Sequence, residues 1–208
     1  MLLIVWALVA PLQADERPVL LVLGDSLSAA YGIAEDDGWV ALLQRRLDTE
    51  GHDYRVVNAS VSGETTDGGL ARLPRALDVH RPSIVVVELG ANDGLRGISL
   101  GEMRRNLLEI TELSQASGAR VLLVGMHLPP NYGPAYTERF HATFREVAVR
   151  KRIPLVPFLL DGVGTERSLM QDDGLHPTAA AQPRLLENVW VQLAPILTSE
   201  GRKLTARP

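Results

Sequence analysis

The sequence contains no cysteine, which excludes several kinds of chemistry from the start. Without cysteine the chain has no disulfide bond, no thiolate nucleophile, no cysteine-ligated metal ion and no lipid anchored through a cysteine. Aromatic residues are also few, at 5% of the chain. A cleft that binds sugars by stacking them on several aromatic rings is therefore disfavoured.

The chain also lacks an excess of basic residues. A net charge of −4 and a pI near 5.7 give no overall attraction for phosphate backbones. We interpret the basic cluster of Arg202, Lys203 and Arg207 as a solvated chain end, and we expect no nucleic-acid partner. The remaining composition, 46% hydrophobic and 22% charged in 208 residues, is typical of one globular domain with a sizeable core.

The apolar run at the N-terminus, residues 1–10, is too short to cross a bilayer but has the length of a signal-peptide core. We expect residues 1–14 to be a signal peptide, residues 19–198 the domain and residues 199–208 a tail. Two features fit export less well: no Lys or Arg precedes the run, and Leu12-Gln13-Ala14 only half matches a cleavage site. An apolar terminus or a misplaced start remains the alternative. We expect a periplasmic or secreted monomer without a stable membrane anchor.

From Val19 onward, short apolar runs alternate with amphipathic stretches, a pattern typical of βαβ units around a parallel sheet. The predicted strands are residues 19–23, 54–58, 84–89, 121–125 and 155–158. The predicted helices are residues 39–47, 66–77, 100–117, 135–149 and 185–197. We therefore expect one three-layer α/β domain, whose ligands bind in the loops that follow the carboxyl ends of the strands.

A candidate nucleophile follows the first predicted strand, in Gly24-Asp25-Ser26-Leu27. A serine hydroxyl attacks an acyl group only when a positioned base removes its proton. We expect a tight strand-to-helix turn here that exposes the Ser26 hydroxyl and leaves backbone N–H groups unpaired. The alternative is that Ser26 or Asp25 merely caps the first helix.

The candidate base lies near the C-terminus, in Asp173-Gly174-Leu175-His176-Pro177. At a separation of three residues, a bent loop can aim both side chains at Ser26, with His176 as general base and Asp173 holding its tautomer. Asp172 competes with Asp173 for this role. His127 follows the fourth strand and could line the cleft, and its role stays open. We expect the other histidines to be solvated, namely His52, His80 and His141.

Ester hydrolysis also needs hydrogen-bond donors aimed at the oxyanion of the tetrahedral intermediate. The candidates are the backbone N–H groups of Ser26 and Gly63 and the side-chain amide of Asn92, which follow the first three strands. Alternatively, Gly63 only makes a turn and Asn92 only caps one.

Together these blocks resemble those of the SGNH hydrolase family: G-D-S-L, a glycine after the second strand, G-x-N-D and D-x-x-H, here residues 24–27, Gly63, residues 90–93 and residues 173–176. Longer segments, such as MQDDGLHP (residues 170–177), are similar to the branch of bacterial periplasmic thioesterases, lysophospholipases and arylesterases. The resemblance implies a flavodoxin-like fold with strand order 2-1-3-4-5 and no metal or other cofactor. It also implies export and broad action on acyl-CoA thioesters, lysophospholipids and small aryl esters.

Two loops bear on the substrate. Gly94-Leu95-Arg96-Gly97 has a glycine at each end and could hinge over an acyl chain; the alternative is an ordinary loop. Leu128 would give the cleft an apolar edge. We predict acyl contacts from Leu95 and Leu128. Two alternatives to the acyl esterase stay open: a carbohydrate acetyl esterase with the same catalytic set, and a noncatalytic flavodoxin-like binding module, although no nucleotide-binding glycine motif is present.

Overall fold

The computed structural model describes residues 17–204, with side chains as far as Leu197. A five-stranded parallel sheet forms the centre, with its strands in the order β2-β1-β3-β4-β5. The predicted fold class and strand order are confirmed. The five strands are β1 (Val19–Gly24), β2 (Arg55–Asn58), β3 (Ile84–Glu88), β4 (Arg120–Val124) and β5 (Leu155–Val156).

Burial of the strands follows their position in the sheet. Every residue of β1 and β3 is buried, as expected for near-continuous apolar runs covered on both faces. The edge strand β2 is only half-buried. At the other edge β5 stops two residues earlier than predicted, because Pro157 has no N–H group to donate to the sheet.

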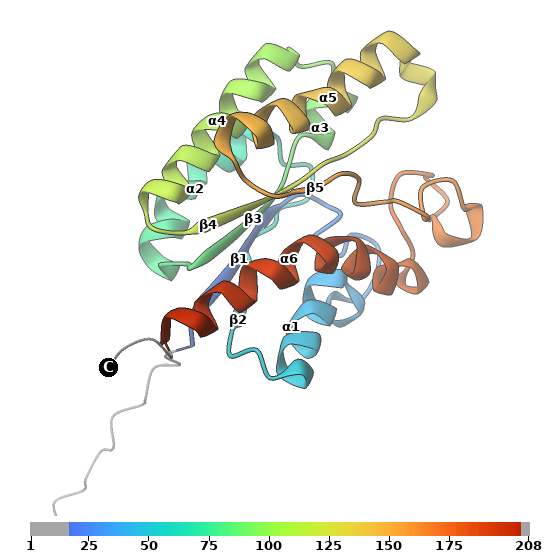
Figure 1. Cartoon of the computed structure of the whole chain (residues 1–208). Coiled ribbons are helices and arrows are strands. Elements are labelled where there is room, and N and C mark those ends of the chain that lie inside the picture. The colour runs from blue at the N-terminus through green and yellow to red at the C-terminus, as the bar shows by residue number, and fades with distance from the viewer. Residues whose placement is uncertain (1–16, 205–208) are drawn as a thin grey trace, which may run out of the picture.

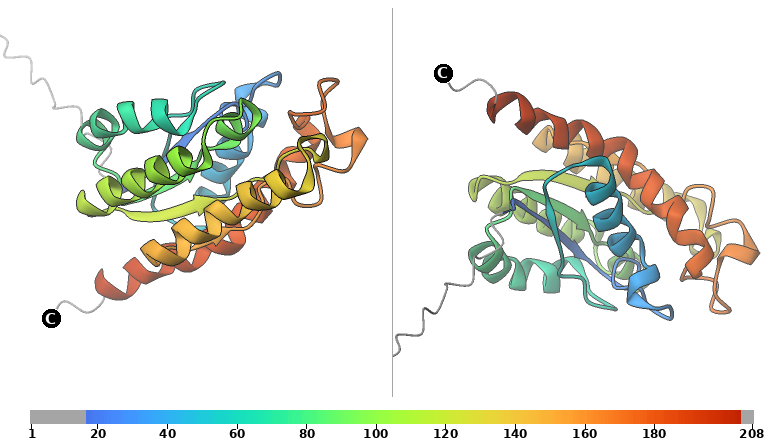
Figure 2. Two further views of the ribbon diagram at one scale, coloured as in Figure 1. Left: turned by 90° about the horizontal axis from the view of Figure 1, so that it is seen from above. Right: turned by 90° about the horizontal axis from the view of Figure 1, so that it is seen from below.

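Helices cover both faces of the sheet and make the three layers (Figure 1). Helices α2, α4 and α5 lie on one face, whereas α1 and α6 pack together on the other, as Figure 2 shows from above and below. The long helices are α1 (Trp39–Glu50), α2 (Thr66–His80), α4 (Leu100–Ala116), α5 (Pro134–Lys151) and α6 (Gln182–Leu204). The short ones are α3 (Ala91–Leu95) and the 3-10 turns η1 (Glu35–Asp37), η2 (Pro130–Tyr132), η3 (Arg167–Leu169) and η4 (Ala179–Ala181).

The apolar stripes predicted for the helices form the core. In α4 the stripe consists of Met103, Leu107, Ile110 and Leu113, of which the first three are fully buried and Leu113 is half-buried against the core. In α6 the predicted stripe, which ends at Leu197, is buried as well. The helix itself continues to Leu204, so the boundary predicted between domain and tail, at residues 198 and 199, falls inside α6.

The predicted signal peptide, residues 1–14, lies outside the described residues. Between residues 17 and 204, no helix combines the length and the apolar character needed to cross a membrane.

Candidate active site

The loops at the carboxyl end of the sheet meet around one cavity of about 470 Å³. Ser26 reaches it from the loop after β1, Asn92 from α3 directly after β3, and His176 from the long loop between β5 and α6. Parallel topology brings these loops to the same edge of the sheet, although Ser26 and His176 are 150 residues apart.

The turn that carries Ser26 differs from the prediction, because no helix starts there. The chain makes one helix-like turn, in which the N–H of Ala29 donates to the Asp25 carbonyl at 2.9 Å, and α1 begins only at Trp39. Asp25, not Ser26, stabilises this turn: its Oδ1 accepts the Leu27 N–H at 3.0 Å. The Ser26 side chain is thus left to face the cavity.

The predicted triad residues are in hydrogen-bond contact. Nε2 of His176 lies 2.9 Å from the Ser26 hydroxyl, and Nδ1 lies 2.6 Å from Oδ2 of Asp173. With the ring proton on Nδ1, the ring donates to the carboxylate and Nε2 accepts from the hydroxyl. This geometry allows the imidazole to take a proton from Ser26.

Asp173 is fixed as a carboxylate by its own loop. Its Oδ1 accepts the backbone N–H groups of Leu175 at 2.9 Å and of His176 at 3.0 Å. Burial raises the pKa of Asp173, but these bonds and the one from the His176 ring outweigh it and lower the pKa to about 2. The competitor Asp172 is exposed and makes no hydrogen bond or ion pair with any residue between 17 and 204.

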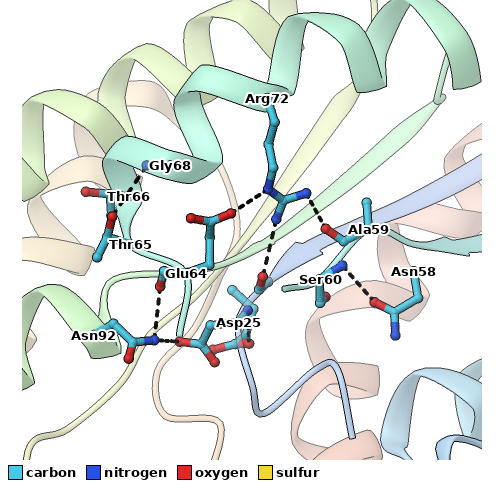
Figure 3. A network of polar contacts seen from close by, with 12 residues as sticks. Asp25, Asn58, Ala59, Ser60, Glu64, Thr65, Thr66, Gly68, Arg72 and Asn92 are labelled. Atoms are coloured by element: carbon cyan, nitrogen blue, oxygen red, sulfur yellow. Dashed lines mark hydrogen bonds and ion pairs between the residues drawn. The ribbon is translucent and has the colours of Figure 1, made fainter. Parts of the chain in front are cut away.

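Two acceptors fix the orientation of the Asn92 side-chain amide. Nδ2 donates to the Glu64 carbonyl at 3.0 Å and to Oδ2 of Asp25 at 3.1 Å (Figure 3). Asn92 lines the cavity, whereas Gly63 does not line it and lies beside Glu64 in the loop after β2. Gly63 has φ +79°, a conformation that favours glycine.

Apolar side chains form most of the cavity wall, and both residues predicted to contact an acyl chain are among them, Leu95 and Leu128. Leu95 packs against the core and Leu128 is buried, so this wall is rigidly supported. Among the described residues that line the cavity, Phe158 is the one aromatic residue besides the histidines.

His127 lines the same cavity but contacts no triad residue. Its ring stacks on His141 at 3.6 Å between centroids and meets Phe158 edge-on at 4.7 Å. Burial, and then the neighbouring His141, lower the pKa of His127, so it is held neutral. The expectation that His52, His80 and His141 are solvated is wrong, because all three are half-buried. Nδ1 of His141 lies 3.2 Å from the Met126 carbonyl.

A family model for GDSL-like lipases and acylhydrolases matches residues 22–183. The chain belongs to this family. The esterase TesA of Pseudomonas aeruginosa is 55% identical over 191 residues, 92% of this chain and 95% of the relative. An arylesterase of Vibrio mimicus is 44% identical over 92% and 95% of the two chains. Thioesterase 1/protease 1/lysophospholipase L1 of Escherichia coli is 41% identical over 91% and 89%.

The solved structures show the same fold as this GDSL hydrolase. A crystal structure of TesA, 56% identical in sequence, superposes with a TM-score of 0.84 and covers 85% of this chain and 98% of its own. The chain is thus an ester hydrolase of the SGNH type.

Three side chains near the site of this GDSL hydrolase were not predicted. Tyr31, 52% exposed, packs against the His176 ring with 4.5 Å between centroids and the ring planes tilted by 40°. Asp25 and Glu88 form a buried pair of carboxyl groups beneath the Ser26 turn. A sequence signal for Glu88 existed, since it is the one charged residue in the apolar run IVVVEL.

Proposed function

We propose that this hydrolase cleaves acyl esters and thioesters through an acyl-enzyme on Ser26. The observation that carries the proposal is the continuous chain of hydrogen bonds from Asp173 through His176 to Ser26, at 2.6 and 2.9 Å, which opens onto an apolar cavity. An orienting carboxylate, a neutral imidazole and a hydroxyl in this order are what nucleophilic acyl transfer requires.

In the first step, Oγ of Ser26 attacks the acyl carbonyl carbon while its proton passes to Nε2 of His176. The carbonyl oxygen becomes an oxyanion, which accepts hydrogen bonds from the N–H groups of Ser26 and Gly63 and from the NH₂ group of Asn92. Asn92 exchanges one of its two present acceptors, the Glu64 carbonyl or Asp25, for the oxyanion in this step. Collapse of this intermediate expels the alcohol or thiol, which takes the proton from His176. Water then attacks the acyl-enzyme with His176 as base again, and releases the carboxylic acid and Ser26.

The cavity supports an apolar acyl group as the bound part of the substrate. Ser26, His176 and Asn92 are among its few polar lining residues, while Leu95 and Leu128 stand in an otherwise largely apolar wall. The names of the relatives, an esterase, an arylesterase and a thioesterase/lysophospholipase, support ester and thioester substrates of this kind.

We further propose that the chain works as an exported monomer without a metal or other cofactor. The apolar run of residues 1–10 supports export. The proposed reaction needs only side chains and water, so no cofactor has a step to perform.

The test is hydrolysis of p-nitrophenyl esters and acyl-CoAs of increasing chain length by the wild type and by Ser26→Ala. We expect turnover that rises beyond acetyl and is lost in the variant, together with fluorophosphonate labelling that requires Ser26. Turnover confined to acetyl esters would point instead to a carbohydrate esterase, and neither turnover nor labelling to a binding module.

A further inference from the structure

Glu88 ends β3 next to the Ser26 turn, because Glu88 pairs with Gly24 across the sheet. Its side chain is completely buried, at 0% exposure. Oε2 of Glu88 accepts hydrogen bonds from the Ser28 hydroxyl at 2.7 Å and from the Asp25 N–H at 3.3 Å. These donors stand on either side of Ser26 in the chain, so one buried oxygen holds both ends of the turn.

Asp25 links this turn to the predicted oxyanion hole. It is 1% exposed, and its Oδ2 accepts from the Asn92 amide at 3.1 Å (Figure 3). Since a carboxylate accepts and does not donate, it selects the orientation of Asn92 in which NH₂, and not the carbonyl oxygen, faces Asp25. Glu88 and Asp25, both buried, and the half-buried Asn92 therefore form one connected set of polar groups.

Arg72 reaches the end of β1, but its hydrogen bonds go to groups other than Asp25 and Glu88. The guanidinium of Arg72, on α2, donates to Oε2 of Glu64 at 2.7 Å, to the Ala59 carbonyl and to the Gly24 carbonyl at 3.4 Å (Figure 3). It thus fastens the loops after β1 and β2 to each other. Throughout residues 17–204, neither Asp25 nor Glu88 forms an ion pair.

Two ionised carboxyl groups in contact, both buried and without a cation, would be strongly unfavourable. Burial, followed by the charge of Asp25, raises the pKa of Glu88 well above its usual range. Burial also raises the pKa of Asp25, to about 6, although the Leu27 N–H, Glu88, His176 and Asn92 oppose the rise. The second oxygen of Glu88, Oε1, is buried and has no hydrogen-bond partner in the described structure, and a buried oxygen without a donor is more costly when it carries charge.

We propose that Glu88 is a positioning residue that works as a neutral carboxylic acid, holding both sides of the Ser26 turn and leaving Asp25 as the single charge that orients Asn92. This inference rests on the proposed function, in which Ser26 attacks and Asn92 binds the oxyanion. Neutrality matters because a second negative charge beneath the turn would oppose the oxyanion that forms above it.

The test compares Glu88→Gln with Glu88→Ala. Glutamine copies the neutral acid: its carbonyl oxygen can accept from Ser28 and Asp25, and its NH₂ replaces the protonated oxygen. We expect Glu88→Gln to keep kcat within about threefold of the wild type with an unshifted pH–rate profile. Glu88→Ala should lower kcat at least 30-fold while KM stays within about twofold, because the turn is misplaced but the acyl wall is intact.

A matched packing control is Leu47→Ala, which replaces a fully buried side chain of α1 and opens a cavity. Leu47 lies near the start of β2, at the end of the sheet opposite to Glu88. It should lower the melting temperature without lowering kcat of the folded enzyme. An independent readout is the infrared C=O stretch of a protonated carboxyl group at pH 8, which should be present in the wild type and lost in Glu88→Gln.

The proposal is overturned if Glu88→Gln is as impaired as Glu88→Ala, because an ionised carboxylate is then required. A shift of the acidic limb to lower pH in Glu88→Gln would do the same, since it means that a negative charge was removed. If Glu88→Ala and Leu47→Ala have equal kcat, Glu88 contributes only to packing and does not position the turn. If Glu88→Ala does not fold, the pH–rate profile and the infrared band of Glu88→Gln test the proposal instead. The infrared band needs no turnover, so its loss or persistence separates this inference from a failure of the proposed function.

Discussion

Replacing Asp173 with asparagine should reverse the hydrogen-bond polarity of the triad. The carboxylate accepts the proton on Nδ1 of His176 at 2.6 Å. An asparagine that turns its NH₂ group toward Nδ1 favours the tautomer with the proton on Nε2, which cannot accept from Ser26. The side-chain oxygen that accepts the loop N–H groups is retained, so the loop should keep its shape.

The size of the effect follows from the exposure of Asp173. The same change in a buried serine-protease triad lowers kcat about 10⁴-fold. The Asp173 side chain is 40% exposed, so water can partly replace it. We therefore expect a loss of about 10²–10⁴ in kcat, which corresponds to about 2.7–5.4 kcal/mol of transition-state stabilisation.

The assay is hydrolysis of p-nitrophenyl butyrate at pH 8, with kcat and KM determined separately. Asp172→Asn is the matched control, one residue away, exposed and without a partner among residues 17–204, and it should keep kcat within about twofold. Since the pKa of Asp173 lies near 2, its ionisation should not appear in the pH–rate profile between pH 5 and 9. A larger loss in Asp172→Asn than in Asp173→Asn would refute the assignment.

Three further predictions concern neighbouring side chains. His176→Ala should abolish p-nitrophenyl ester hydrolysis while His127→Ala keeps substantial activity, and the opposite result would make His127 the base. Asn92→Ala should lower kcat about 10²–10³-fold with little change in KM, and a change confined to KM would contradict an oxyanion role. Asp25 has a raised pKa in the fold, so its contribution to stability is complete below pH 3.8 and is lost as pH rises through about 6. In urea titrations, the stability of Asp25→Asn relative to the wild type should therefore rise by about 2.4 kcal/mol between pH 4 and pH 7, and a constant difference would contradict the raised pKa.

The sequence predicts the fold well because its elements are long and strongly patterned. The run IVVVEL is buried on both faces as β3, and the apolar stripe of α4 lies in the core. The predictions from sequence are wrong where local chemistry overrides the hydrophobic pattern. Pro157 ends β5 early, and the turn after β1 leads through a single turn and η1 before α1 begins.

The candidate site is predictable for a topological reason. Ser26 and Asn92 each follow a parallel strand, and all such strands end at the same edge of the sheet. Residues that act across neighbouring strands are harder to find, because their contacts depend on register. Glu88 reaches Ser28 only because Glu88 pairs with Gly24, and spacing along the chain does not reveal that pairing.

The acidic residues around Ser26 show how one residue type serves different roles according to its surroundings. Asp173 lies in an open loop and accepts three hydrogen bonds, so it stays charged and can stabilise the imidazolium that forms in catalysis. Asp25 and Glu88 lie beneath the turn with no ion-pair partner among residues 17–204, so burial opposes a charge on each and a charge on one opposes a charge on the other. Negative charge is thereby kept on the side of His176, where the proposed reaction develops a positive charge. It is limited to one carboxylate beside Asn92, where the proposed reaction forms an oxyanion.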